Sequence, residues 1–181
     1  MRLFHDRWPW RRTADGRTVI ELVPRWLRAS LGLLLILSAV GCMMIRNVEH
    51  DPDRWHVDPL AAARTGKPND YLVAPEGMAA APVDRALGVL GEAPARLMAR
   101  FDRVARAAPR TAIVGGSVDA LHITYVQRSA LFGFPDYVSV RAVPVPGGAS
   151  LAIWSRARYG YSDLGVNKAR VERWLEALDG G

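Results

Sequence analysis

Residues 120–158 read ALHITYVQRSALFGFPDYVSVRAVPVPGGASLAIWSRAR, and this stretch decides the fold. It holds three runs rich in β-branched and aromatic residues, at positions 120–128, 137–143 and 150–158, separated by breaks that contain Gly and Pro. Such runs are typical of strands joined by tight turns. Because a parallel crossover needs roughly a dozen residues or more, breaks this short favour antiparallel pairing. With a fourth run at residues 111–114, the stretch predicts an antiparallel meander.

Two segments with helical periodicity flank the meander. Residues 94–108 begin with Pro94, which suits the first position of a helix, and residues 166–178 end before a pair of glycines. We also expect a first strand at residues 83–90, so the order is β-α-β-β-β-β-α. This order predicts an α+β fold, with one antiparallel sheet of about five strands and two helices on one face. The apolar helix faces consist of Leu97, Phe101, Val104, Ala105 and Ala108, and of Val171, Trp174, Leu175 and Leu178.

A second informative stretch, ASLGLLLILSAVGCMMI at residues 29–45, carries no charge. As a helix it rises about 26 Å, close to the ~30 Å of a hydrocarbon core, and its flanking residues lengthen it. We therefore expect one transmembrane helix at residues 26–46. The residues predicted to anchor it are Trp26, Leu33, Leu34, Leu35, Ile36 and Leu37.

The charge distribution predicts the orientation of this helix. Residues 1–28 hold seven Arg against three acidic residues, so they carry four of the six net positive charges of the chain. Basic flanks stay in the cytoplasm. We therefore expect a single-pass bacterial inner-membrane protein with a cytoplasmic N-terminus and a periplasmic C-terminal domain. The remaining charge is nearly balanced, with no basic stripe, which argues against a nucleic-acid partner.

Two other interpretations of the apolar run stay open. One is a cleaved signal peptide, although the preceding segment is long for one and no A-x-A site follows. The other is a lipoprotein signal, because Ala39-Val40-Gly41-Cys42 is similar to a lipobox, with Ala in place of the usual Leu. Cys42, the only cysteine, is then a candidate lipidation site, and a single cysteine excludes an internal disulfide.

We divide the chain into four parts. Residues 1–25 form a short cytoplasmic segment, with a candidate hairpin turn at Asp15-Gly16, and residues 26–46 form the transmembrane helix. Residues 47–82, rich in Ala and Pro, predict an extended connector that lies on the domain without a core of its own. Residues 83–181 form the periplasmic α+β domain.

Three motifs carry a family resemblance. They are YGYSDLGVNKARVE at residues 159–172, FGFPDY at residues 132–137 and DPDRWHVDP at residues 51–59. Together they resemble the domain-of-unknown-function 1499 family (DUF1499), in its alpha-proteobacterial type with an N-terminal membrane anchor. The resemblance implies a bacterial envelope domain, often behind a membrane anchor or lipoprotein signal, with no established chemistry.

The stretch from Ser162 to Arg170 has two interpretations. In the first it caps a helix: Ser162 or Asp163 accepts free backbone N–H groups, Leu164 pins the turn against the core, and Asn167 serves as a second cap. Arg170 then pairs with Asp163 or Asp136. In the second, the helix N-terminus joins a basic cleft that binds an anion. Its basic residues are Arg128, Arg156, Arg158 and Lys168.

An aromatic loop is the other candidate contact region. Phe132 and Phe134, with Tyr137, form either a lid on the core or an exposed patch that contacts a protein or lipid partner.

The sequence predicts no catalytic set, metal site or cofactor. Ser162, Asp163 and His122 lack the G-x-S-x-G turn of a hydrolase. His50 and His56 lie near acidic residues only in a proline-rich segment, and Gly115-Gly116-Ser117 predicts a hairpin turn, not a phosphate loop. We therefore expect a non-enzymatic accessory or assembly subunit of a larger integral membrane protein complex. The alternative is an envelope module that binds a small anionic ligand or a lipid head group.

Overall fold

The computed structural model of the chain describes residues 23–180. These divide into two compact units at residues 44 and 45, within the last turn of helix α2 (Arg25–Arg46). The second unit holds the short helix α3 (Pro52–Trp55), the 3₁₀ helix η1 (Pro59–Ala61), and the helices α4 (Pro94–Ala107) and α5 (Val166–Asp179). Its strands are β1 (Asp70–Ala74), β2 (Arg85–Ala86), β3 (Thr111–Ser117), β4 (His122–Arg128), β5 (Pro135–Val145) and β6 (Gly148–Ala157).

The second unit is built on one six-stranded sheet in the order β2-β1-β6-β5-β4-β3. Strands β3 to β6 form the predicted antiparallel meander, which confirms the α+β class. The sheet is mixed and not wholly antiparallel, because β1 pairs in parallel with β2 and antiparallel with β6. The strand count is therefore six, against the expected five.

The sixth strand comes from the segment that we expected to be a coreless connector. Residues 71–74 of β1 are buried, and the strand lies inside the sheet between β6 and β2. A short continuous apolar run gives no alternation, so its periodicity does not distinguish a strand buried on both faces from other structures. Conversely, the strand expected at residues 83–90 shrinks to the two residues of β2 and one isolated bridge between Leu90 and Ala149.

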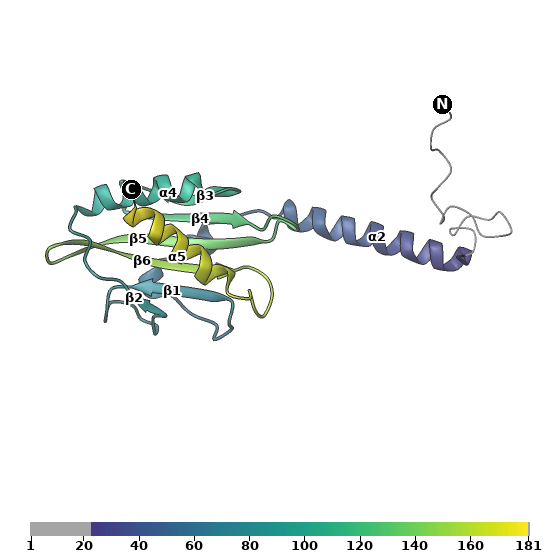
Figure 1. The fold of residues 1–181 in the computed structure, drawn as a ribbon, viewed down its shortest axis with the longest axis horizontal. Helices are drawn as coiled ribbons and strands as arrows, with labels where there is room; N and C mark the ends of the chain where they lie inside the picture. The colour runs from purple at the N-terminus through teal and green to yellow at the C-terminus, as the bar shows by residue number, and fades with distance from the viewer. Residues whose placement is uncertain (1–22, 181) are drawn as a thin grey trace, which may run out of the picture. The chain divides into compact units, whose positions relative to one another are not determined.

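Helices α4 and α5 pack on the same face of the sheet (Figure 1). Side chains alternate along each strand, so β5 and β6 place every second residue in this core. Phe101 of α4 and Trp174 of α5 meet Tyr125 of β4, with ring centroids 5.8–6.4 Å apart. The predicted apolar faces of both helices are therefore the faces that pack on the sheet.

The first unit holds one described element, the helix α2. It is long enough and apolar enough to cross a membrane, and none of its residues is buried. The six predicted anchor residues and Cys42 lie in it. The hairpin turn predicted at Asp15-Gly16 falls outside the described residues.

Candidate functional site

The sheet face opposite α4 and α5 is covered by residues 45–62, which we call the strap. Trp55 of the strap stacks on Tyr137 of β5 with a centroid distance of 3.8 Å and an interplanar angle of 8°. Further along, Ala62 packs with Leu72 and Trp154. The strap contains α3 and η1, and each begins with an aspartate side chain that accepts a backbone N–H, followed by proline. These local signals fix two tight turns, which lets a short segment follow the sheet.

Histidines hold the middle of the strap. His56 Nδ1 lies 3.0 Å from Thr124 Oγ1, and its ring stacks on His122 at 3.9 Å. His122 Nε2 lies 3.1 Å from the Val57 carbonyl oxygen. Burial lowers the pKa of both histidines. Repulsion from a protonated His56 lowers the pKa of His122 further.

Arginines at the ends of β4 and β6 hold the start of the strap. Arg128 donates to the carbonyl oxygens of Ile45 at 3.2 Å and Val48 at 3.4 Å. Arg158 donates to the Glu49 carbonyl and to the Tyr137 hydroxyl, both at 2.9 Å. The Ile45 carbonyl lies in the last turn of α2, and those of Val48 and Glu49 belong to no regular helix or strand. None of the three is satisfied by a following helical turn, so these bonds fix the chain where it enters the second unit.

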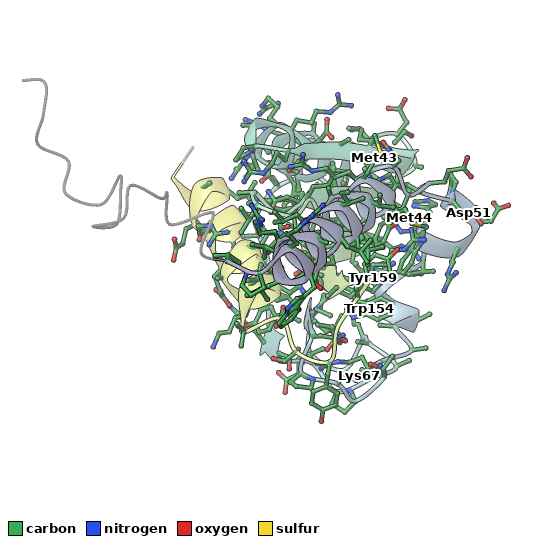
Figure 2. The ribbon with its side chains drawn as sticks, turned by 90° about the vertical axis from the view of Figure 1, so that its right-hand side faces the viewer. Met43, Met44, Asp51, Lys67, Trp154 and Tyr159 are labelled. Atoms are coloured by element: carbon green, nitrogen blue, oxygen red, sulfur yellow. The ribbon has the colours of Figure 1, made fainter. Side chains whose placement is uncertain are left out.

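A cavity of about 450 Å³ lies between the strap and β6. Arg156 and Arg158 reach it because side chains two apart on a strand share a face. Figure 2 shows three of its lining residues, Lys67, Trp154 and Tyr159. The residues that carry its chemistry are the cations Arg54, Lys67, Arg156 and Arg158, the rings of Trp55, Trp154 and Tyr159, and the carboxylate Asp70.

Arg156 is the unusual member of this set. Its side chain is 7% exposed, and no carboxylate of the described residues lies within 4 Å of its guanidinium. It donates to uncharged oxygens, namely Trp55 O at 2.7 Å, Ser139 Oγ at 3.2 Å and Trp154 O at 3.3 Å. Burial lowers the pKa of Arg156 to about 10. A buried cation is costly without a partner charge, and Arg156 meets uncharged oxygens in place of a carboxylate.

Aromatic rings stabilise the Arg156 guanidinium by cation–π contacts. The Arg156 Cζ atom lies 4.2 Å from the centroid of Trp154 and 5.7 Å from that of Trp55. The Cζ atoms of Arg54 and Arg158 also lie within 5.4 Å of the Trp55 centroid. Trp55 Nε1 is buried and has no acceptor among the described residues. Trp55 thus carries a buried N–H group without a partner beside the cluster of arginines.

Asp70, the one acidic residue of the lining, already has hydrogen-bond and ion-pair partners. It accepts from Trp154 Nε1 at 2.8 Å and pairs with Arg64 at 2.7 Å. Its charge is therefore paired with Arg64, and its hydrogen bond to Nε1 holds the Trp154 ring in place.

The structure separates the predicted basic cleft into parts. Arg156 and Arg158 line the cavity, whereas Arg128 binds the strap and the loop before β5. Lys168 is exposed on α5 and does not line the cavity. Asn167 is fully buried on the helix side of the sheet, where it bonds to Ser155, Asn69 and Asp163.

The stretch from Ser162 to Arg170 has the contacts of a cap. Asp163 accepts from the backbone N–H of Gly165 at 2.9 Å and of Asn167 at 2.8 Å, and Ser162 accepts from Leu164 at 3.3 Å. Arg170 pairs with Asp136 at 2.6 Å, and burial raises the pKa of Asp136 more than this arginine lowers it.

The expectation for Leu164 was wrong. Its side chain does not pin the turn against the core but is 94% exposed, because its φ of 55° turns it outward. The aromatic loop also divides: Tyr137 is buried, whereas Phe132 and Phe134 are exposed.

The match to known families is restricted to one domain. A family model described as protein of unknown function (DUF1499) matches residues 60–178 of the chain. The chain belongs to the DUF1499 family. No curated protein and no solved structure matches this DUF1499 chain. Its alpha-proteobacterial type stays a prediction.

Sequence reasoning found only Arg156 and Arg158 among the residues that carry the chemistry of the cavity in this DUF1499 domain. Trp55 and Lys67 lie in the expected connector, and Trp154 and Tyr159 were not named as site residues. The alternation of 154, 156 and 158 along β6 was the available signal for a shared face. No comparable signal places Trp55, since its position depends on where the strap crosses the sheet.

The side chains considered for a triad do not bond to one another in the DUF1499 domain. His122 bonds to the strap, while Ser162 and Asp163 cap the turn before α5. Among residues 23–180 no group of three His, Cys, Asp or Glu side chains is arranged to hold a metal ion.

Proposed function

We propose that this DUF1499 protein is a membrane-tethered module that binds a small anionic ligand in the cavity between the strap and β6. One observation carries the proposal: a buried arginine, Arg156, lines the cavity with no carboxylate of the described residues in ion-pair range. Three further cations line the same cavity.

The lining favours a phosphate or carboxylate group attached to an organic part. A charge-assisted hydrogen bond contributes about 1.5–3 kcal/mol, and more where water is excluded. The rings of Trp55, Trp154 and Tyr159 give apolar walls for the rest of the ligand. A lipid head group and a free phosphate ester share this chemistry.

Thermal unfolding of the full chain in detergent tests the proposal. The probes are inorganic phosphate, glycerol phosphate and short-chain phosphatidylglycerol, with uncharged glycerol as the blank. Lys67→Glu and Arg54→Glu change exposed cavity cations that make no ion pair among the described residues. Each variant should need an about tenfold higher concentration of an anionic probe to reach the same shift of the unfolding midpoint. Arg103→Glu, on the exposed side of α4, should need the same concentration as the wild type.

Two results would refute an anion site. One is an equal response of Lys67→Glu and Arg103→Glu to every anionic probe. The other is a wild-type chain whose unfolding midpoint no anionic probe raises. A response to phosphatidylglycerol alone indicates a lipid head group as the ligand, and a response to inorganic phosphate indicates a free anion.

We further propose that the helix α2 spans the bacterial inner membrane and that the DUF1499 domain lies in the periplasm. The length and composition of α2 support a span, and the seven Arg of residues 1–28 support a cytoplasmic N-terminus. A phosphatase reporter fused after residue 181 should be active, because that enzyme needs the oxidising periplasm. Activity only of a cytoplasmic reporter would contradict this orientation.

The non-enzymatic accessory role in a membrane complex stays a prediction. The apolar face of α2 has no buried residue in the described chain, which supports a partner helix or lipid around it. Affinity purification from detergent extracts tests it. An integral membrane protein in stoichiometric amount is expected, and a chain that migrates alone would count against the role.

A further inference from the structure

Exposed apolar side chains concentrate at one end of the sheet. The loop after β4 and the loop after β6 both lie at this end, and the β5–β6 hairpin lies at the other (Figure 1). Ten large apolar side chains of residues 45–180 are exposed, and seven of them belong to these two loops or to the first residue of α5. We call these seven the apolar end. They are Leu131, Phe132, Phe134, Tyr159, Tyr161, Leu164 and Val166.

The aromatic members touch one another across the two loops. Phe132 and Phe134 pack edge to face at 5.9 Å, and Phe134 packs on Tyr159 at 6.2 Å. The loops are also joined by a backbone hydrogen bond from Arg158 to Pro135. Phe132, Phe134 and Tyr159 therefore form one aromatic cluster that joins the two loops of the apolar end.

Leu164 is held in an exposed position by an unusual backbone turn. It is the most exposed large apolar side chain of the described residues, and its left-handed backbone is unusual for leucine. Asp163 holds the turn through the backbone N–H groups of Gly165 and Asn167. The fold thus keeps a leucine outward at a cost in backbone energy.

The chain enters the second unit beside this surface. Arg46 donates to the carbonyl oxygen of Leu131 at 3.3 Å. Arg128 bridges the two segments by donating to the carbonyls of Ile45 and Gly133 at 3.2 and 2.9 Å. A side chain on Gly133 would collide with Arg46, so glycine permits this close approach. The loop of residues 129–134 is therefore fixed to Ile45 and Arg46, the first residues of the second unit.

We propose that the apolar end docks on the surface of the bilayer that holds α2. Since Arg46 bonds to Leu131, a span that ends at Arg46 keeps this loop at the membrane surface. Tyr, Phe and Leu beside Arg46 are the residue types that proteins place at the membrane interface. The inference rests on the membrane anchoring in the proposed function.

Docking would also determine which ligands reach the cavity. Tyr159 belongs both to the aromatic cluster and to the cavity lining. With Tyr159 at the interface, the cavity would open beside the lipid head groups.

Lipid-dependent quenching of a fluorescent probe tests the docking. The full chain is placed in vesicles of phosphatidylethanolamine and phosphatidylglycerol. One probe is attached to Leu131→Cys and a matched probe to Val89→Cys, each combined with Cys42→Ser. Val89 is also apolar and exposed, but it lies beside Gly147 at the hairpin end. A third sample carries the probe on the native Cys42.

Lipids with a nitroxide near the head group should quench the Leu131 probe severalfold more than the Val89 probe. Equal quenching of these two, with Cys42 quenched by acyl-chain nitroxides, would overturn docking while the anchor stands. An unquenched Cys42 probe would overturn the anchor itself. A Leu131 probe that is shielded from water yet not quenched by lipid would mean that a protein, a second copy included, covers the surface, and would also overturn the proposal.

Discussion

At the residue scale, two buried arginines on opposite sides of the sheet, one in β6 and one in α5, have different partners. Arg156 lies on the strap face and donates to uncharged oxygens, whereas Arg170 lies on the helix side and pairs with Asp136. The second is therefore a charge that the fold itself pairs, whereas the first is the charge that we propose to be available to a ligand. Their removal should have different consequences for stability.

We predict that Arg170→Met lowers the free energy of unfolding by about 3–5 kcal/mol, because Asp136 is left buried and unpaired. Arg156→Met should cost much less, since a buried ion without a partner gives way to an apolar chain of similar length. It should nevertheless abolish the response to anionic probes. Urea unfolding of the full chain in detergent measures both, with Arg173→Met on the exposed side of α5 as control. Equal losses for Arg156→Met and Arg170→Met would contradict this assignment.

At the element scale, the strap depends on neutral histidines. His50 lies 2.8 Å from both Tyr137 and Arg128, and since the arginine must donate, the histidine Nε2 accepts. Burial lowers the pKa of His50, and the nearby Arg128 and Arg158 lower it further. His56 and His122 also have lowered pKa values, the latter with Arg141 and Asp58 near it. Protonation of His50 would place a third cation beside two arginines.

Stability should therefore fall in acid. A lowered pKa in the folded state means that the unfolded chain binds more protons, so stability is lost as pH falls from 6.5 through the folded-state pKa. We expect the unfolding midpoint to drop between about pH 7 and about pH 5, and His50→Gln to flatten this dependence. Thermal unfolding across that range provides the measurement. A midpoint that rises in acid, or an unchanged slope in His50→Gln, would refute the strap's dependence on neutral histidine.

The element scale also shows where prediction from sequence succeeds. Strands β3 to β6 and both packed helices follow from local alternation, periodicity and turn residues, which act within a few positions of the chain. Strand β1 was missed because its place beside β6 depends on contacts more than 80 residues away, such as Leu72 with Trp154. The same reason explains the cavity: Arg156 and Arg158 were found from β6 alone, but Trp55 depends on the path of the strap.

Strand β1 offers a direct test of this correction. Leu72 is fully buried with Ala62 and Trp154, so Leu72→Ala should lower the free energy of unfolding by about 2–5 kcal/mol. A peripheral connector would tolerate the change. Val89→Ala, at an exposed apolar position, should stay within about 0.5 kcal/mol of the wild type in the same urea titration. A Leu72→Ala variant as stable as Val89→Ala would contradict the placement of β1 in the core.

At the scale of the whole molecule, the chain enters the second unit at the apolar end. The chain leaves α2 at Arg46 and is bound at once by the loop of residues 129–134. The strap then crosses the sheet and forms one wall of the cavity. Within the second unit, the entry of the chain, the apolar end and the cavity therefore follow one another, and the proposed docking on a membrane would use this arrangement.

The form of the anchor gives the last prediction. The helix α2 runs without interruption from Arg25 to Arg46, and Cys42 lies in its last turns, followed by Met43, Met44 and Ile45. A lipoprotein would be cut before Cys42 and acylated there, which would remove most of the helix. We expect the helix to be retained, so the intact mass of membrane-extracted protein should equal that of the unprocessed chain. Cys42→Ser should then remain in the membrane fraction after carbonate washing, as the wild type does. A diacylglycerol-sized addition with loss of the first 41 residues, together with release of Cys42→Ser, would establish the lipid anchor instead.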